Sequence, residues 1–336
     1  MRAFVIDAYK QPVHEADIPE PVVGDNDVLI QVAAVGLNIL DEKVRAGEFT
    51  AFLPYPTPLV LGHDVAGTVI GIGTAVHSFA VGDTVFARVR DHRIGTLTER
   101  IAADEADVAL SPASVTLIEA ASLPLVALTA WQALIDKGGA SAGQRVLIHA
   151  GAGGVGSIAI QLAKHLGAFV ATTTSGKNVD FVRSLGADLV IDYQTQNFGD
   201  ELTGYDFVLD SLGGENLATS LRVLRPGGKA IGIAGPPTPE FAREIGMNPL
   251  LRLGVGAISR SIRAQAKKLE VSYEFLFMRA NGAQLRQIAD LVDAGTIRPI
   301  VGATYSFDHT PEALAALHVG GIRGKSVVIG AEATDS

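Results

Sequence analysis

Residues 145–167 read RVLIHAGAGGVGSIAIQLAKHLG, and this stretch decides the fold. An apolar run ending at Ala150 predicts a strand, three glycines predict a tight turn, and the apolar-periodic residues that follow predict a helix. Gly151 and Gly153 have no side chain, so the chain can turn sharply and let a pyrophosphate approach the backbone. Gly156 lets helix and strand pack closely, and the helix N-terminus presents free amides to the phosphates. The stretch therefore predicts a dinucleotide site with contacts from Gly151, Gly153, Gly154, Val155 and Gly156.

The end of the next strand indicates which nucleotide binds. An Asp or Glu about twenty residues after the first glycine would bind the free ribose 2′-hydroxyl of NAD. Here the strand over 168–172 continues into Thr173-Thr174-Ser175-Gly176-Lys177, which contains no acid. Hydroxyl groups and a lysine can bind a 2′-phosphate, although the same residues also suit a turn that caps the next helix. We predict that NADPH is preferred over NADH, with contacts from Thr174, Ser175 and Lys177.

Composition and charge limit the class of protein. The 336 residues exceed one ordinary core, and 48% of them are apolar, so two domains are expected. No apolar run is long enough to span a bilayer, and the N-terminus shows no signal-peptide pattern. The net charge of −9 argues against nucleic acid, and the absence of cysteine excludes disulfides, thiolate catalysis and cysteine-bound metal. We expect a cytoplasmic protein with neither a nucleic-acid nor a membrane partner.

The pattern of apolar residues divides the chain into two parts. Over the first 120 residues, short alternating runs such as Val28-Leu29-Ile30-Gln31-Val32 lie between Gly, Pro and Asp turns, which is typical of a mostly β domain. From about Ala121, strands and helices alternate, and parallel strands with helical crossovers form a doubly wound sheet. We therefore predict an α/β protein with a mostly β domain over 1–120, completed by 295–336, and a Rossmann dinucleotide-binding domain over 121–294.

Several further motifs together resemble the medium-chain dehydrogenase/reductase superfamily, in its zinc-independent, quinone-oxidoreductase-like branch. They cover nearly the whole chain: Ala34-Val35-Gly36-Leu37-Asn38, Leu61-Gly62-His63-Asp64-Val65-Ala66-Gly67, Val81-Gly82-Asp83-Thr84-Val85, the 150–156 turn, Leu185-Gly186-Ala187-Asp188 and Gly324-Lys325. The resemblance implies a GroES-like β domain closed over the nucleotide-binding sheet, with the active site in the cleft between them. It also implies reduction of quinones, enones or related conjugated carbonyls with NADPH, often by a homodimer.

The chain departs from the zinc-dependent members of that superfamily. They have a cysteine near the position of Asn38, a His-Glu pair at the position of His63-Asp64, and a four-cysteine lobe. This chain has no cysteine, and His63 with Asp64 alone cannot form the usual zinc ligand set, so no metal site is expected. His63 is either a substrate-facing residue or a residue that supports the turn after Pro58.

Without a metal, hydride transfer requires a donor to stabilise the negative charge on the carbonyl oxygen. Conjugation in quinones and enones spreads that charge and lessens the need for a Lewis acid. The resemblance points to Asn38 and Lys43 as donors, and Tyr55 is a candidate because it lies close to His63 in sequence. Asn38 can instead cap the helix at Asp41, Lys43 can be solvated, and Tyr55 can simply pack. A proton taken directly from solvent would make a catalytic acid unnecessary.

Other cofactor contacts follow from the resemblance position by position. Thr129, expected to open a helix over 130–135, matches a threonine on the nicotinamide side. Tyr193 matches a tyrosine near the 2′-phosphate, and Arg323 or Lys325 is placed to reach the nicotinamide half. A surface cation is more often only solvated.

Residues 236–280 have no clear interpretation, because this segment is longer than the connection in compact relatives. It could cover the substrate cleft or extend a dimer contact, and a strand is expected over 273–277. The apolar edge strand favours a homodimer. The leading hypothesis is an NADPH-dependent quinone or enone reductase. A metal-free alcohol or aldehyde dehydrogenase and a non-enzymatic NADPH-binding sensor or partner protein remain alternatives.

Overall fold

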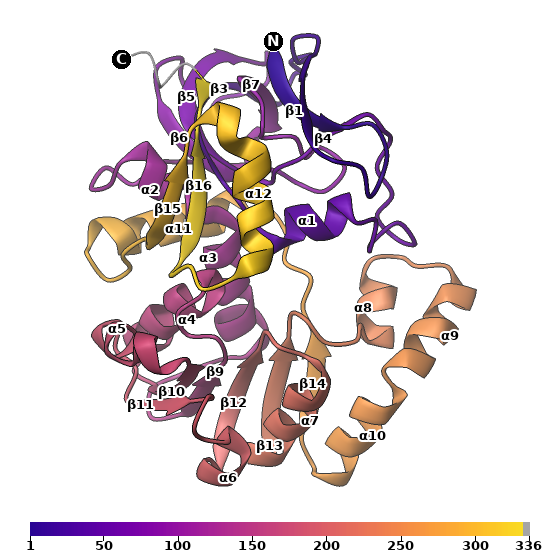
Figure 1. Ribbon diagram of the computed structural model, residues 1–336, viewed down its shortest axis with the longest axis vertical. Helices are drawn as coiled ribbons and strands as arrows, with labels where there is room; N and C mark the ends of the chain where they lie inside the picture. The colour runs from indigo at the N-terminus through magenta and orange to yellow at the C-terminus, as the bar shows by residue number, and fades with distance from the viewer. Residues whose placement is uncertain (332–336) are drawn as a thin grey trace. The chain divides into compact units, whose positions relative to one another are not determined.

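A computed structural model describes residues 1–331 and divides the chain into two compact units. Unit 1 consists of Met1–Leu128 together with the described residues from Arg279 onward, and unit 2 is Thr129–Met278 (Figure 1). The boundaries at 128 and 278 differ from the expected 120 and 294. The second difference arises because α11 (Gly282–Asp293) packs on strand β8 (Val108–Leu110) of unit 1, where Gly282 meets the Val108 carbonyl group.

Unit 1 is mostly β, as the alternating runs predict. Its long strand β3 (Asp27–Gly36) alternates between fully buried and partly exposed residues over most of its length. Strands β5, β7 and β16 all pair with β3 in antiparallel register, so the C-terminal segment completes the sheet begun by the N-terminal residues. The other strands of unit 1 are β1 (Arg2–Ile6), β2 (His14–Asp17), β4 (Leu59–Val60), β5 (Asp64–Ile72), β6 (Thr84–Arg88), β7 (Arg100–Asp104), β8, β15 (Val301–Tyr305) and β16 (Lys325–Ile329).

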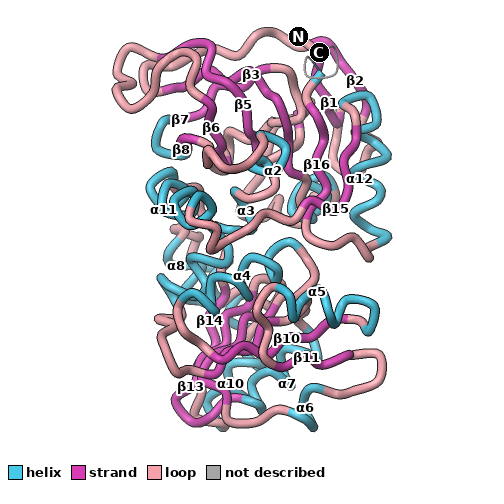
Figure 2. Tube along the Cα trace, turned by 90° about the vertical axis from the view of Figure 1, so that its left-hand side faces the viewer, coloured by secondary structure: helices cyan, strands magenta, loops and turns pink. Residues whose placement is uncertain are grey.

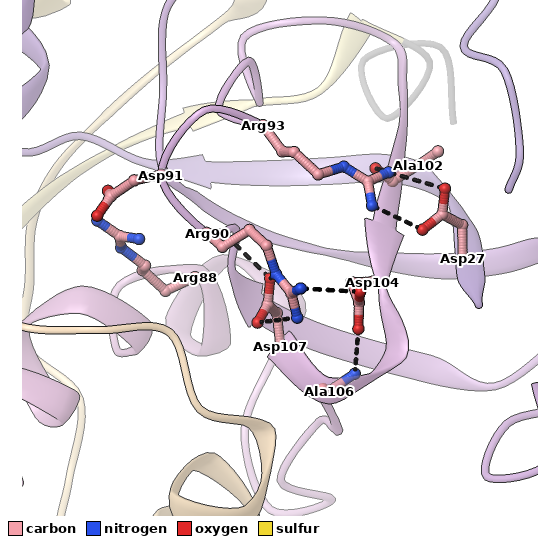
Figure 3. A network of polar contacts seen from close by, with 9 residues as sticks. All are labelled: Asp27, Arg88, Arg90, Asp91, Arg93, Ala102, Asp104, Ala106 and Asp107. Carbon is pink, nitrogen blue, oxygen red and sulfur yellow. Dashed lines mark hydrogen bonds and ion pairs between the residues drawn. The ribbon is translucent and has the colours of Figure 1, made fainter. Parts of the chain in front are cut away.

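Ion pairs of arginines in the loop between β6 and β7 fix that loop (Figure 3). The Arg93 guanidinium donates to both carboxylate oxygens of Asp27 at 2.8 and 2.7 Å, and Arg90 binds both oxygens of Asp107. Arg93 holds the pKa of Asp27 below its usual value, because its hydrogen bonds stabilise the carboxylate. These bidentate pairs hold the loop between β6 and β7 against the sheet of unit 1.

Unit 2 contains a six-stranded parallel sheet in the order β11-β10-β9-β12-β13-β14. Crossovers on either side of the reversal at β9 and β12 place helices on both faces of the sheet, and Figure 2 shows α4 and α5 opposite α6 and α7. The reversal is the topological switch point where ligands bind in such sheets. The strands are β9 (Arg145–Ile148), β10 (Phe169–Thr174), β11 (Leu189–Asp192), β12 (Tyr205–Asp210), β13 (Leu224–Gly232) and β14 (Ser272–Phe275).

The helices of unit 2 are a π-helix over Gln132–Lys137, α4 (Gly154–His165), α5 (Val179–Ser184), α6 (Phe198–Glu201), α7 (Gly214–Val223), α8 (Pro239–Glu244), α9 (Pro249–Ile258) and α10 (Arg260–Lys268). Unit 1 carries α1 (Ile39–Arg45), α2 (Leu117–Ala121), α11 and α12 (Thr310–Val319), and α3 (Pro124–Trp131) crosses the boundary. The helix expected to start at Thr129 was therefore predicted too short, because Pro124 provides its first turn. No helix within residues 1–331 is long and apolar enough to cross a lipid bilayer.

Candidate active site and dinucleotide loop

The glycine turn in unit 2 has the geometry of a phosphate-binding loop. It joins the end of β9 to the first turn of α4, at the switch point of the sheet. A Cβ at Gly156 would collide with the Ala150 carbonyl oxygen, and a Cβ at Gly151 with the Thr172 hydroxyl. A Cβ at Gly153 would meet only the Ala150 carbonyl oxygen, at 3.3 Å. Gly151 and Gly156 therefore permit the close packing of strand and helix, while Gly153 leaves the backbone open to an incoming group.

The residues predicted to bind the 2′-phosphate lie around the C-terminal end of β10. Thr174 and Ser175 are buried, and Lys177 follows them in an exposed turn. The sequence reasoning missed Asp192, which ends the neighbouring strand β11 and pairs with Thr174 in the parallel register. A Cβ at Gly176 would lie 2.7 Å from Asp192 Oδ2, so a carboxylate does reach this loop. Asp192 belongs to the strand beside β10, so the residues that directly follow β10 in the sequence do not reveal this carboxylate.

Tyr193 directly follows Asp192 and has a mostly exposed side chain. Its backbone N–H donates to the Thr174 carbonyl oxygen at 3.1 Å, which ties the start of its loop to β10. The backbone of Tyr193 is therefore held next to the end of β10, where the predicted phosphate contacts lie.

Unit 1 contains a buried polar cluster that joins two predicted site residues far apart in sequence. Asn38 precedes α1 and Lys325 begins β16, and the Lys325 ammonium donates to Asn38 Oδ1 and to Asp64 Oδ2. Asn38 Nδ2 donates to Asp64 Oδ2 at 3.0 Å and to the Gly36 carbonyl oxygen at 3.1 Å. Both amide hydrogens of Asn38 are thus used within the protein, and none remains for a substrate oxygen.

Asp64 also anchors the start of α3. Its Oδ1 accepts from the Leu125 backbone N–H at 2.9 Å, in the first turn of that helix. Burial raises the pKa of Asp64 and lowers that of Lys325, while their mutual attraction opposes both shifts. The two groups stabilise each other's charge in a position that water does not reach.

His63 lies in the same region but faces a different partner. Its Nδ1 lies 2.5 Å from Asp41 Oδ1, while Asp41 Oδ2 accepts from the Asn38 backbone N–H at 2.7 Å. The His63 ring is fully buried, and its Nε2 has no hydrogen-bond partner among the described residues. His63 is therefore held by α1, a contact that neither the substrate-facing role nor support of the turn after Pro58 predicts.

These residues do not fit a zinc ion. The Lys325 ammonium binds Asn38 and Asp64, and a divalent cation beside it would be repelled. The described residues include no group of three or more histidine, aspartate or glutamate side chains arranged to hold a metal, and the chain has no cysteine. A zinc ligand set of the usual kind cannot form without displacing Lys325.

The remaining predicted residues differ in burial and in the contacts they make. Tyr55 is buried, its ring lies 5.8 Å from that of His92, and its hydroxyl group makes no hydrogen bond within the described chain. Lys43 is 39% exposed and pairs weakly with Glu48 at 3.6 Å. Thr129 is buried in α3, and Arg323 is exposed before β16.

A buried network under the glycine turn was not predicted from the sequence. His149, the residue after β9, contacts Thr173 Oγ1 through Nδ1 at 3.0 Å and Ser220 Oγ through Nε2 at 2.9 Å. Ser220 donates in turn to Asp210 Oδ2 at 3.0 Å. Burial lowers the pKa of His149 to about 4. The only signal in the sequence was a histidine inside an apolar strand, which more often marks a satisfied core residue.

Comparisons with known proteins agree with this fold. A family model described as "Alcohol dehydrogenase GroES-like domain" matches residues 24–113, and one described as "Zinc-binding dehydrogenase" matches residues 185–328. The chain is 36% identical over 353 residues to the "NAD(P)H oxidoreductase RTN4IP1, mitochondrial" of Mus musculus, covering 98% of this chain and 89% of that protein. It is 34% identical over 324 residues to the "NADPH-dependent alkenal/one oxidoreductase, chloroplastic" of Arabidopsis thaliana, covering 94% and 75% respectively.

A solved structure shares the arrangement along the whole chain. The quinone oxidoreductase from Coxiella burnetii superposes with a TM-score of 0.80 at 28% identity, covering 98% of this chain and 99% of that one. The fold of this chain is thus shared with that solved structure over nearly its whole length. The chain belongs to the medium-chain dehydrogenase/reductase superfamily and is an oxidoreductase that uses a nicotinamide cofactor.

Proposed function

We propose that this protein is an NADPH-dependent reductase of quinones, enones or related conjugated carbonyls, and that it works without a metal. The observation that carries the proposal is the turn over 150–156, in which Gly153 leaves the backbone open at the N-terminus of α4. The names of the relatives support the substrate class, since they include an alkenal/one oxidoreductase and a quinone oxidoreductase.

NADPH would supply the hydride, and the residues of this chain would bind and orient it. The amides of 153–156 would bind the pyrophosphate, and Thr174, Ser175 and Lys177 would bind the adenosine ribose and its 2′-phosphate. Lys177 provides the positive charge that favours a 2′-phosphate, and Asp192 provides a negative charge that opposes it. We propose that the lysine and the hydroxyl groups outweigh the single carboxylate.

The Asn38–Asp64–Lys325 cluster favours a conjugated acceptor. The Lys325 ammonium group occupies the position where zinc-dependent relatives would be expected to hold their metal. Both side-chain N–H groups of Asn38 already donate within the protein. A carbonyl whose developing charge spreads over a conjugated system needs less stabilisation at its oxygen. Simple alcohols and aldehydes are therefore poorer substrates in this proposal.

Cofactor binding and turnover test the proposal together. The wild-type protein is screened for NADPH oxidation with quinones, enones and aldehydes, with and without EDTA, and its zinc content is measured by elemental analysis. We expect oxidation with the conjugated acceptors, no effect of EDTA, and no stoichiometric zinc. Activity only with aldehydes, or activity that EDTA abolishes and zinc restores, would refute the proposal.

A pair of glycine variants tests the loop itself. Gly153→Ala would place a methyl group where the phosphates approach, at a position where the only atom within 4 Å of the new Cβ is the Ala150 carbonyl oxygen, at 3.3 Å. We expect NADPH to bind at least about tenfold more weakly, a change of about 1.4 kcal/mol. Gly254→Ala is the matched control, because a Cβ there meets no atom within 4 Å. Equal NADPH affinity in the two variants would remove the loop from the cofactor site.

A further inference from the structure

The helices between β13 and β14 carry an unusual distribution of charge. Residues 245–269 include five of the 27 basic residues of the chain and none of its 36 acidic residues. The protein as a whole has a net charge of −9, so this segment is a local exception. It corresponds to α9, α10 and the turn before them, which lie together with α8 in unit 2 (Figure 1).

Four arginines from these helices surround one hollow. Its volume is about 560 Å³, and it is lined by Arg243, Arg252, Arg260 and Arg263, together with apolar residues that include Leu253 and Ala257. Only Arg243 has a nearby acid, Glu240, at 2.9 Å on the surface. The other three form no ion pair with any described residue. The hollow is therefore a concentration of uncompensated positive charge beside apolar side chains.

Neutral groups hold two of these guanidinium groups in place. Arg252 Nε donates to the Met247 carbonyl oxygen at 2.6 Å. Arg263 donates through Nε to Ser259 Oγ at 3.2 Å and through Nη2 to the Gly256 carbonyl oxygen at 3.0 Å. An arginine has five N–H donors, so each keeps hydrogens for an external anion. These contacts orient the side chains without neutralising them.

The helix next to the hollow exposes large apolar side chains. In α9 only Val255 is buried, whereas Leu250, Leu253 and Ile258 are 77%, 73% and 68% exposed. A helical projection places Leu250, Leu253 and Ala257 on one face, on the side opposite Val255. Exposed leucines beside arginines fit an interface where apolar chains lie below a layer of anionic groups.

A second copy of this chain is a poor occupant for this surface. A two-fold axis would place α9 and α10 of one copy against the same helices of the other, with arginine facing arginine. Such an interface would bury like charges with no acid from residues 245–269 to compensate them. Charge complementarity instead calls for a partner that is anionic and apolar at once.

We propose that the α8–α10 surface binds the face of an anionic phospholipid membrane, with phosphate groups in the arginine hollow and the α9 leucines inserted among the acyl chains. This contact is peripheral and concerns no membrane-spanning segment. The absence of a membrane-spanning helix within residues 1–331 does not bear on such a contact. Each arginine near an anionic membrane strengthens binding by about 1 kcal/mol, or about fivefold.

Vesicle co-sedimentation tests the proposal with the full-length protein. The probes are vesicles of phosphatidylcholine alone and vesicles of phosphatidylcholine mixed equally with phosphatidylglycerol. We expect binding only to the mixed vesicles, and weaker binding at high salt because the charges are screened. Arg252→Gln with Arg260→Gln should lower the partition coefficient by at least about tenfold. Leu250→Ser with Leu253→Ser should lower it to a similar extent. No binding, or equal binding to the two kinds of vesicle, would overturn the proposal.

A matched control separates this surface from general charge. Arg222→Gln with Arg286→Gln removes two exposed arginines from α7 and α11, and vesicle binding should stay within about twofold of wild type. An equal loss in the control would mean that net charge alone drives binding. Light scattering on the leucine variant should give the wild-type mass. A halved mass would identify the α9 face as a subunit interface and exclude the lipid proposal.

Discussion

His149 Nε2 lies 2.9 Å from Ser220 Oγ, and this contact connects the end of β9 to α7 across the switch point of the sheet. The network has a consistent set of donors if His149 is neutral with its proton on Nε2. Thr173 then donates to Nδ1, His149 to Ser220, and Ser220 to Asp210, while the Ala150 N–H donates to Thr173 at 3.2 Å. Ala150 has a φ of +52°, in the left-handed region. The network thus holds the strained first residue of the glycine turn.

The network should make cofactor binding sensitive to acid. His149 has a folded-state pKa of about 4, below its usual value of 6.5. Its contribution to stability is complete above pH 6.5 and is lost as the pH falls toward 4, because the folded state resists protonation. We expect unfolding free energy and NADPH affinity to fall together over this range, by up to about 3 kcal/mol in stability.

Titration of two variants identifies the group responsible. In His149→Gln, the unfolding free energy and the NADPH affinity should change little between pH 6.5 and 4. Denaturant unfolding and NADPH titrations measure the two quantities. His165→Gln, which alters an exposed histidine on α4, should leave the wild-type fall in both quantities unchanged. If both variants keep the wild-type profile, another group carries the pH dependence.

Tyr55→Phe separates two roles for the unpartnered hydroxyl group. The neighbouring Tyr9 hydroxyl bonds to the backbone of residue 55, so the substitution leaves those contacts intact. A hydroxyl that donates to the substrate carbonyl would cost about tenfold or more in kcat when removed. A hydroxyl that is only buried without a partner would give unchanged kcat and equal or higher stability. We expect the loss of kcat, and Lys43→Ala should show none, because Lys43 is solvated beside Glu48.

Nucleotide preference depends on two opposite charges. We expect NADPH to bind at least about tenfold more tightly than NADH, or about 1.4 kcal/mol. Lys177→Ala should remove most of this difference, whereas Asp192→Asn should increase it, because Asp192 approaches the same loop. Calorimetric titration of both nucleotides measures the ratio. Equal affinities in the wild type would remove the phosphate-site assignment.

The outer strand of unit 2 should pair with a second copy. β14 is the last strand of the sheet and bonds only to β13 among the described residues, so its outer edge is unpaired. Light scattering should give twice the 35.0 kDa chain mass. Ser272→Asp, at an exposed position of β14, should shift the mass toward the monomer by placing like charges across the two-fold axis. Phe275 is a poor position for this test because its ring packs on Phe241 at 5.0 Å.

Local patterns predicted the elements well, because each depends on neighbouring residues. The strand before the glycine turn and the helix after it lie where the apolar periods place them. The resemblance correctly indicated the family and the pairing of the C-terminal strand with the β domain. It also placed Asn38 and Lys325 among the site residues, although their contact joins positions 287 residues apart.

The features that sequence could not predict are set by packing between distant elements. Asp192 reaches the nucleotide loop only because β11 lies next to β10 in register. His149 is neutral because three elements surround it, and no local pattern reports that burial. The structure of residues 236–280 could not be predicted from the sequence. In α9 only Val255 is buried, so the apolar residues of this helix do not recur on one face that packs on the core.

The pairing of β16 with β3 has a consequence for synthesis on the ribosome. Unit 2 is one continuous segment, Thr129–Met278, and every residue it needs is available before the C-terminal segment is translated. Unit 1 lacks the strand Lys325–Ile329 until all of unit 2 has been translated. Domains fold as their residues emerge, so we expect the nucleotide-binding unit to fold first. The strands before residue 128 must therefore wait, with Ala34, Val35 and Gly36 of β3 lacking their β16 partner, until residues 325–329 have been translated.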